Sequence, residues 1–573
     1  MKPWRYARGL LALASAAWLC GCATTSPSCP AVRMNQLGFA PEQPKLLVLE
    51  ASSAVRYQAL DSQGKLLLSG RTATPEFWAE AGRKAAVLDL SALQTAGDYS
   101  LLLEGCQAAQ LVQVRPAPWA AAHDAVAKAY YFNRASTALT AELAGPWARA
   151  AGHPDDQVRI HASAASASRP AGTVLSSPQG WYDAGDYNKY VVNSGVTLLT
   201  MLQAWTDFAG FYQQRRWAIP ESGNTLPDLL DETLWNLRWL RTMQDPADGG
   251  VYHKLTNLKF DGTVMPAQAN SPRYLVQKTT AAALNYAAVM AKASQVLQQF
   301  DRQLPGLAAD YAQSAVQAWH WAKANPAVVY QQPSDVSTGA YGDDKLTDEF
   351  ATAAAQLFLL TGDPAYWLEF SAFNVPMQVA SWNNPVALVY WQLLRSETLT
   401  ESQKQPLKTA FLAEAELFLH QQQQSPYRVA LIKSDFIWGS NSVAAGKAVL
   451  LYQSYLLSGQ AQYRQAALNL LDYLFGRNPT GYSFVTGVGS QTPQHIHHRP
   501  SEADGMKAPV PGWLAGGPNP GQQDKCNYTS RQPALSYLDD YCSYASNEIA
   551  INWNAPLLYL LAAFAAEKHS SEH

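Results

Sequence analysis

Two aspartates whose spacing suits acid–base chemistry lie in the segment 180–190, which reads Gly-Trp-Tyr-Asp-Ala-Gly-Asp-Tyr-Asn-Lys-Tyr. Asp183 and Asp186 are separated by Ala-Gly, so a tight turn can direct both carboxylates into one small space. Carboxylates held this close can polarise a water molecule, as a general base does. The flanking Trp181 and Tyr182 have flat amphipathic rings of the kind that stack on sugars. A solvated turn explains the same residues, and other parts of the chain have to separate the two interpretations.

A second group of candidate residues, His495-Ile-His-His-Arg499, lies in the Gly- and Pro-rich segment 477–545. A loop of this length in a compact domain is usually functional. His497 and Arg499 can donate hydrogen bonds to sugar hydroxyls and can orient carboxylates. Three histidines also suggest zinc, but no acidic or thiol partner stands at ligand spacing. A loop held by its own hydrogen bonds is the remaining alternative.

Glu548 is the candidate general acid. It follows Asn547 at the expected start of an apolar helix, and Tyr544, Ile549 and Trp553 are its aromatic and apolar neighbours in the sequence. Desolvation by these side chains would raise the pKa of the carboxyl and keep it protonated near neutral pH. The N-terminus of a helix would lower the same pKa. The sequence therefore identifies the residue but leaves the sign of its pKa shift open.

Composition narrows the class of protein. With 573 residues the chain is too long for one ordinary domain. A net charge of -3 with 15% charged residues gives no sign of a nucleic-acid partner. The 18 Trp and 28 Tyr residues suit a carbohydrate groove as well as a large core. Composition alone therefore does not decide between a glycan partner and a large core, and we expect the chain to be a monomer.

The N-terminus predicts export. Residues 1–21 combine a basic start with the apolar run 10–19, which is too short to span a bilayer, and they resemble a bacterial lipoprotein signal peptide. Cys22 would then carry the lipid and residues 22–29 would form a tether, with ordinary signal-peptide cleavage as the alternative. We expect an exported protein of the bacterial cell envelope, periplasm-facing or at the cell surface, that meets the membrane only through its lipid anchor.

Four further cysteines can form disulfides in an exported protein. They are Cys29, Cys106, Cys526 and Cys542. Three pairings exist for four cysteines. Pairing within each end of the chain, Cys29 with Cys106 and Cys526 with Cys542, agrees with a division into an N-terminal and a larger C-terminal domain. The chain has no Cys-x-x-Cys spacing, so a metal site built from these thiols is not expected.

Two regions of the chain differ in periodicity. Residues 30–115 contain short apolar or alternating runs separated by turn signals, which predicts a small all-β sandwich with an accessory role. Residues 117–567 contain about twelve helix-length segments without intervening strands, and 568–573 form a tail. This pattern predicts an all-α barrel of helix hairpins, with a stacked solenoid as the rival architecture. The loops between the helices, including the one that carries Trp438, would form one rim of the barrel.

Five segments resemble motifs of glycoside hydrolase family 9, the inverting cellulases. They are residues 181–190, 219–230, 436–441, 483–499 and 537–555. In the last segment the tyrosines, Asp539, Glu548, Asn554 and Ala555 stand at the family's spacing. The resemblance extends over residues 119–567. It implies an (α/α)6 barrel, and an N-terminal immunoglobulin-like domain is a known companion of this barrel.

The resemblance also implies roles for individual residues. Asp186 resembles the catalytic base, Asp183 the partner that helps to hold the nucleophilic water, and Glu548 the general acid. His497 looks like a substrate-contacting or orienting residue of the catalytic group, and Asp539 like a supporting member of it. The residues expected to bind substrate are Arg499, Trp181, Tyr182, Trp438, Tyr541 and Tyr544.

Two departures from the family pattern concern specificity and metals. Tyr182 replaces the more usual His, which would alter a contact with the sugar. Residues 133–180 contain no cysteine, so the zinc site of some relatives is not supported. Calcium is common in the family, and the oxygen-rich stretch 342–349 is a candidate for a structural calcium site, although a capped helix start explains it equally. We expect no cofactor to be required for the chemistry and leave the metal ligands unassigned.

The activity that the resemblance implies is that of an endo-β-1,4-glucanase acting on cellulose-like β-glucans with inversion. Glu548 would protonate the leaving oxygen while Asp186 takes a proton from water on the opposite face of the sugar. An exo-acting cellodextrinase or glucosaminidase on short oligosaccharides is the alternative within the same chemistry. A non-catalytic glycan-binding lipoprotein is the alternative from another class.

Overall fold

The structure is a computed structural model that describes residues 29–567. The predicted signal peptide, the lipidation of Cys22 and the tail 568–573 lie outside the described residues, as does the tether except for Cys29. Disulfides join Cys29 to Cys106 and Cys526 to Cys542, which is the predicted pairing. Between residues 29 and 567, no helix is both long enough and apolar enough to cross a membrane.

The N-terminal region is a sandwich of two four-stranded antiparallel sheets. The first has the order β1 (Ala31–Arg33), β2 (Leu46–Glu50), β6 (Arg83–Asp89), β5 (Glu76–Trp78). The second has the order β4 (Leu66–Arg71), β3 (Arg56–Leu60), β7 (Gly97–Leu103), β8 (Gln110–Val114). Alternate residues such as Leu47, Leu49, Val112 and Val114 point inward and are fully buried, as the period of a half-buried strand requires.

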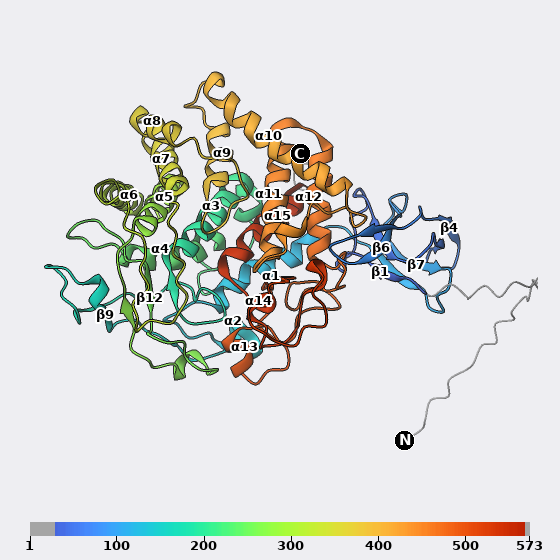
Figure 1. Ribbon diagram of the computed structural model, residues 1–573, viewed down its shortest axis with the longest axis horizontal. Coiled ribbons are helices and arrows are strands. Elements are labelled where there is room, and N and C mark those ends of the chain that lie inside the picture. The colour runs from blue at the N-terminus through green and yellow to red at the C-terminus, as the bar shows by residue number, and fades with distance from the viewer. Residues whose placement is uncertain (1–28, 568–573) are drawn as a thin grey trace, which may run out of the picture.

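The rest of the chain is a barrel of two concentric rings of helices. The inner helices are α3 (Val191–Gln213), α5 (Thr280–Leu297), α7 (Thr347–Thr361), α9 (Val386–Arg395), α11 (Ser440–Ser458) and α15 (Ile551–Ala566). The outer helices are α1 (Trp119–Phe132), α4 (Asp228–Thr242), α6 (Leu307–Ala324), α8 (Pro364–Phe373), α10 (Glu401–Gln423) and α12 (Ala461–Leu474). The outer helices pack on inner ones, for example α6 on α5 and α12 on α11, and α10 packs on both α9 and α11. The helices thus form the predicted (α/α)6 barrel and not a solenoid (Figure 1).

The loops at one rim carry short elements that the periodicity of the sequence did not predict. A sheet of very short strands has the order β10 (Val174–Leu175), β9 (Val158–Ile160), β13 (Tyr274–Leu275), β12 (Lys254–Thr256), β11 (Lys189–Tyr190). Three short helices, α2 (Ala141–Ala144), α13 (Arg499–Ala503) and α14 (Tyr544–Asn547), lie in the long loops. The expectation of a helical region without strands was therefore wrong at this rim. Strand β11 follows Asp186 closely, so its pairing with β12 fixes the end of the aspartate turn.

The sandwich is packed firmly against the barrel, beside α12 (Figure 1). The ring of Trp78 lies 5.0 Å from that of Tyr427 and 6.2 Å from that of Phe436. The buried Asn35 donates a hydrogen bond of 2.8 Å to Asp472 of α12. Gln36 Oε1 accepts hydrogen bonds from backbone groups of the segment 490–491. The same apolar cluster therefore includes side chains of both domains.

Candidate active site

A cavity of about 710 Å³ opens among the loops at the barrel rim. Its size falls in the range of about 300–1,000 Å³ that ligand sites occupy. Of the predicted residues, those that line it are Asp186, Glu548, His497, Arg499, Trp438 and Tyr544. Tyr190, one of the aromatic residues that flank the aspartates, also lines it. Four further aromatic residues that the sequence did not single out as substrate contacts line it as well, namely Phe260, Tyr341, Trp382 and Trp553. Segments up to 369 residues apart thus meet at one site.

The aspartate turn is held by hydrogen bonds to both carboxylates. The backbone N–H of Asn188 donates to Asp186 Oδ1 at 2.7 Å. Asp183 is 1% exposed and does not line the cavity. It accepts hydrogen bonds from Asn193 Nδ2, at 3.0 and 2.9 Å, and from the hydroxyl of Tyr341 at 3.0 Å. Burial, and next the charge of Asp186, raise the pKa of Asp183 to about 8, while these hydrogen bonds act in the opposite direction.

Gly185 connects the turn to the other two parts of the site. Its N–H donates to Glu548 Oε1 at 3.4 Å, and its carbonyl accepts from the N–H and the Nη1 of Arg499 at 3.1 and 2.9 Å. A Cβ at this position would lie 2.3 Å from the carbonyl oxygen of His497 and 3.2 Å from Glu548 Oε1. The residue between the aspartates therefore has to be glycine for the carboxyl groups to approach each other.

Glu548 lies between α14 and α15 and not on a helix. Helix α14 ends at Asn547, α15 begins at Ile551, and the backbone of Glu548 is extended, with φ −72° and ψ 157°. The expectation that a helix begins at this residue was wrong. The pKa of its carboxyl is therefore not lowered by a helix N-terminus that begins at this residue. Burial, and next the charge of Asp186, raise the pKa of Glu548 to about 8. The carboxyl is therefore protonated at neutral pH, as a general acid has to be.

His497 presents a hydrogen-bond acceptor to the cavity. Its Nδ1 lies 2.7 Å from the carbonyl oxygen of Tyr541, which can only accept, so Nδ1 carries a proton. Burial lowers the pKa of the ring, so the imidazole is neutral and its Nε2 is free of a proton. Tyr541 stacks on this ring at 4.8 Å but does not itself line the cavity. It supports His497, and its contact with substrate stays a prediction.

Asp539 is a positioning residue. It accepts hydrogen bonds from the N–H groups of Gln494 and His495 and from Asn547 Nδ2, at 2.9 to 3.1 Å. These bonds tie the segment before His497 to the residue before Glu548. Asp539 does not line the cavity, and these contacts fit the supporting role that the sequence motif predicts for it.

Trp181 and Tyr182 do not contact the cavity, and the prediction that they bind substrate was wrong. Both side chains are fully buried. Trp181 Nε1 donates to Glu232 at 2.7 Å, and the hydroxyl of Tyr182 is 2.8 Å from His153 Nδ1. Their rings face the protein core because the segment before the turn pairs with the end of α1, where Arg134 forms a bridge with Trp181. The substitution at position 182 therefore does not change a sugar contact directly.

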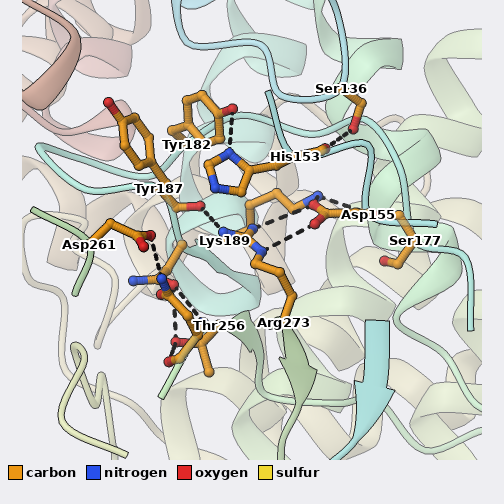
Figure 2. Close-up of polar contacts among 12 residues, drawn as sticks. Ser136, His153, Asp155, Ser177, Tyr182, Tyr187, Lys189, Thr256, Asp261 and Arg273 are labelled. Atoms are coloured by element: carbon orange, nitrogen blue, oxygen red, sulfur yellow. Dashed lines mark hydrogen bonds and ion pairs between the residues drawn. The ribbon is translucent and has the colours of Figure 1, made fainter. Parts of the chain in front are cut away.

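A buried ion cluster supports the turn from the opposite side. Figure 2 shows the carboxylate of Asp155 between the side chains of Lys189 and Arg273. Lys189 Nζ lies 2.8 Å from Asp155 Oδ2, and Arg273 Nε lies 3.1 Å from Asp155 Oδ1. Arg273 Nη1 also donates to the carbonyl of Tyr187, the residue after Asp186, at 2.7 Å. Asp155 and Lys189 are each 1% exposed or less in their side chains, so neither charge has access to water. The cluster fixes the backbone on the C-terminal side of the catalytic aspartate.

The predicted calcium stretch gathers three carboxyl groups at the start of α7. Asp343, Asp348 and Glu349 have buried oxygens without hydrogen-bond partners. Burial raises the pKa of Glu349 to about 10, with the charge of Asp348 as the next cause, and the pKa of Asp348 to about 6. Oxygens of this kind fit a hard cation. However, no group of three or more His, Cys, Asp or Glu side chains within residues 29–567 has metal-site geometry, so calcium at this position stays a prediction.

The site is that of a glycoside hydrolase. It combines a carboxylic acid whose pKa is raised, Glu548, with a second carboxylate, Asp186, in one cavity lined by aromatic rings. Comparison with known proteins gives the family. Residues 119–561 match the family model for glycosyl hydrolase family 9, and residues 28–108 match the one for the cellulase N-terminal ig-like domain. The chain therefore belongs to glycosyl hydrolase family 9, with an N-terminal immunoglobulin-like domain, as the sequence motifs predicted.

Individual relatives agree with this assignment. The chain is 38% identical to the xyloglucan-specific endo-beta-1,4-glucanase BoGH9A of Bacteroides ovatus, over 99% of both chains. It is 30% identical to endoglucanase D of Acetivibrio thermocellus, over 93% of this chain and 83% of that protein. Among solved structures, the one titled Bacteroides ovatus GH9 superposes with a TM-score of 0.88 at 38% identity, over 94% of this chain and 99% of the other.

Proposed function

We propose that the protein is an endo-β-1,4-glucanase that hydrolyses branched β-1,4-glucans of the xyloglucan type with inversion. The observation that carries the catalytic part is the pairing of Glu548, protonated at neutral pH, with Asp186 in one cavity. Two sequence relatives support the bond type and the endo action, because one carries the name of an endo-beta-1,4-glucanase and the other that of an endoglucanase. The 38% identity over the full length of a xyloglucan-specific relative supports the branched substrate.

The reaction follows from the protonation states. Glu548 gives its proton to the glycosidic oxygen as the bond from that oxygen to C1 breaks. Asp186 takes a proton from a water molecule whose oxygen attacks C1 from the opposite face, so the new hydroxyl is α. Glu548 is then ionised and Asp186 protonated, and exchange with solvent restores both. The sequence motif predicts that Asp183 helps to hold this water. Its buried carboxyl accepts hydrogen bonds from Asn193 and Tyr341, so in this proposal Asp183 instead keeps the turn that carries the base in position.

Neutral His497 and charged Arg499 orient the sugar. His497 Nε2 accepts from a sugar hydroxyl, because its other nitrogen is committed to the backbone. The guanidinium of Arg499 is held by the carbonyls of Gly185 and Asp261 and lies over the ring of Phe260 at 5.3 Å. Because these three contacts already hold the Arg499 side chain, it loses little conformational entropy when substrate binds.

The alternatives receive less support. A glucosaminidase needs an extra carboxylate for the amino group, but among residues 29–567 the acidic side chains that line the cavity are Asp186 and Glu548 alone. A non-catalytic glycan-binding protein would not need both an acid and a base. An exo-acting enzyme remains the alternative that the test has to exclude.

The product profile tests this proposal. Digestion of a soluble β-1,4-glucan should lower viscosity long before reducing ends accumulate, since cuts fall inside the chain. Proton NMR of fresh product should show the α-anomer. A steady release of one short oligosaccharide without loss of viscosity would contradict endo action, and a β product would contradict inversion.

The cellular location is a second part of the proposal. Two disulfides indicate an exported protein. We propose that Cys22 carries a lipid that holds the enzyme in the bacterial cell envelope, where it meets polymer or imported oligomers. Membrane fractionation of a Cys22→Ser variant tests this: the variant should leave the membrane fraction, and retention there would contradict a lipid on Cys22.

A further inference from the structure

A second cavity, of about 360 Å³, adjoins the catalytic cavity. The two share four lining residues, Trp382, Trp438, Asn552 and Trp553. None of the acid–base residues lines the second cavity. It is therefore continuous with the substrate site but has no part in the chemistry described above.

The second cavity descends into the barrel. On α11 its lining begins at Ser442 and continues on one face to Gln453. The twelve residues from Ser442 to Gln453 span about 16 Å of helix at the helical rise of about 1.5 Å per residue. Val196 and Thr200 of α3, one turn apart, form the facing wall. The cavity thus follows the barrel axis, whereas the catalytic cavity lies among the loops of the rim.

Its surface combines apolar walls with a few polar groups, as sugar sites do. Three indole rings stand at the junction with the catalytic cavity, and indoles offer flat faces for pyranose rings. Asn552 is 9% exposed, and its Oδ1 is buried without a hydrogen-bond partner. An unpaired buried amide is costly unless something bonds to it. A sugar hydroxyl in the cavity can supply the missing bond once the amide turns toward it.

The junction is preformed by close packing. A Cβ on Gly439 would lie 2.8 Å from the indole nitrogen of Trp553, so this ring rests directly on the backbone at the start of α11. A Cβ on Gly446 would lie 2.5 Å from a methyl of Val379, which fixes the loop before Trp382 against the same helix. The opening is therefore built into the packing of the barrel.

We propose that this second cavity, the branch pocket, binds a single monosaccharide branch of a β-1,4-glucan whose backbone lies in the catalytic cavity. The proposal rests on the proposed function. A β-1,4-linked backbone is extended and stiff, so it continues across the rim, while a branch on a C6 hydroxyl can turn down along the barrel axis. A volume near the lower end of ligand pockets suits one sugar ring and not a further length of chain.

Filling the branch pocket tests the proposal. Ser442→Phe and Ala387→Phe add a ring from two walls, α11 and α9, and both positions line only the branch pocket. The measurement is kcat/KM on a xyloglucan oligosaccharide and on an unbranched cello-oligosaccharide with the same backbone length. We expect the ratio of branched to unbranched kcat/KM to fall at least tenfold in each variant. Ser442→Ala, which keeps the pocket open, should retain the wild-type ratio.

Three outcomes would overturn the branch pocket. They are an unchanged ratio in both folded phenylalanine variants, an equal loss on both substrates, and an equal fall of the ratio in Ser442→Ala. An equal loss would mean that backbone sugars occupy the pocket. Melting temperatures identify a phenylalanine variant that does not fold. The ratio measured with the other phenylalanine variant then tests the proposal. Failure of the wild type to cleave either substrate would instead contradict the proposed function.

Discussion

The glycine between the two aspartates offers the sharpest test of the site geometry. Gly185→Ala places a Cβ 2.3 Å from the carbonyl oxygen of His497, where ordinary contact begins at 3.4 Å. The turn and His497 must therefore move apart by about 1 Å. The same Cβ would lie 3.2 Å from Glu548 Oε1, so the hydrogen bond from the Gly185 N–H to this oxygen is disturbed as well. The substitution thus separates the acid from the turn that carries the base.

The size of the effect follows from the displacement. A misplacement of about 1 Å at a catalytic group costs about 100-fold in rate, or about 2.7 kcal/mol of transition-state stabilisation. Overpacking of a buried contact costs about 1–3 kcal/mol of folding stability. We therefore expect kcat to fall about 100-fold while the protein remains folded and KM changes much less.

The assay is hydrolysis of a soluble β-glucan together with thermal unfolding of the same sample. Gly210→Ala is the matched control, because Gly210 is an exposed residue of α3 with no atom within 4 Å of the added Cβ. Alanine there should raise stability by about 0.5–1 kcal/mol and leave kcat unchanged. A Gly185→Ala enzyme whose kcat stays within twofold of wild type would refute the close approach of turn, histidine and acid.

Three further predictions concern the acid, the pH profile and the domain interface. Glu548→Gln should abolish hydrolysis but retain binding of a cello-oligosaccharide by calorimetry, whereas Glu401→Gln, a side chain 91% exposed, should be neutral. Activity kept in Glu548→Gln would exclude it as the acid. The kcat of the wild type should decline as pH rises through about 8, because ionised Glu548 has no proton to give, and a flat profile to pH 10 would count against this. Trp78→Ala should cost about 3–5 kcal/mol in a denaturant titration, and Phe77→Ala, 62% exposed, should cost little. Equal effects at both positions would mean that the interface does not stabilise the fold.

Local motifs explain why the catalytic pair could be predicted. Asp183, Asp186 and Glu548 stand in short segments of unusual composition. The helical periodicity of residues 117–567 predicted the barrel. The sign of the Glu548 pKa shift required the structure, because the burial that raises this pKa arises only on folding, and because the helix begins only at Ile551. Side-chain direction within a turn is likewise set by distant partners. This is why Trp181, expected at the sugar, lies in the core.

The supporting residues left no trace in the sequence. Asp155 and Arg273 are 118 residues apart and meet through strands of two or three residues, which are too short to show alternation. Tyr341 and Trp382 line the cavity from loops whose paths follow no periodic rule. A motif thus marks the atoms that react, whereas the groups that hold them become visible only when the chain is folded.

The contact between sandwich and barrel has a consequence for biosynthesis. The sandwich leaves the ribosome first, but Trp78 finds its partner rings at Tyr427 and Phe436, roughly 350 residues later. At about 5–20 residues per second this delay is roughly 20–70 s. During that interval the side chain of Trp78 has no partner rings from the barrel to pack against. A nascent chain thus exposes the Trp78 face of the sandwich until the barrel segment that covers it has been synthesised.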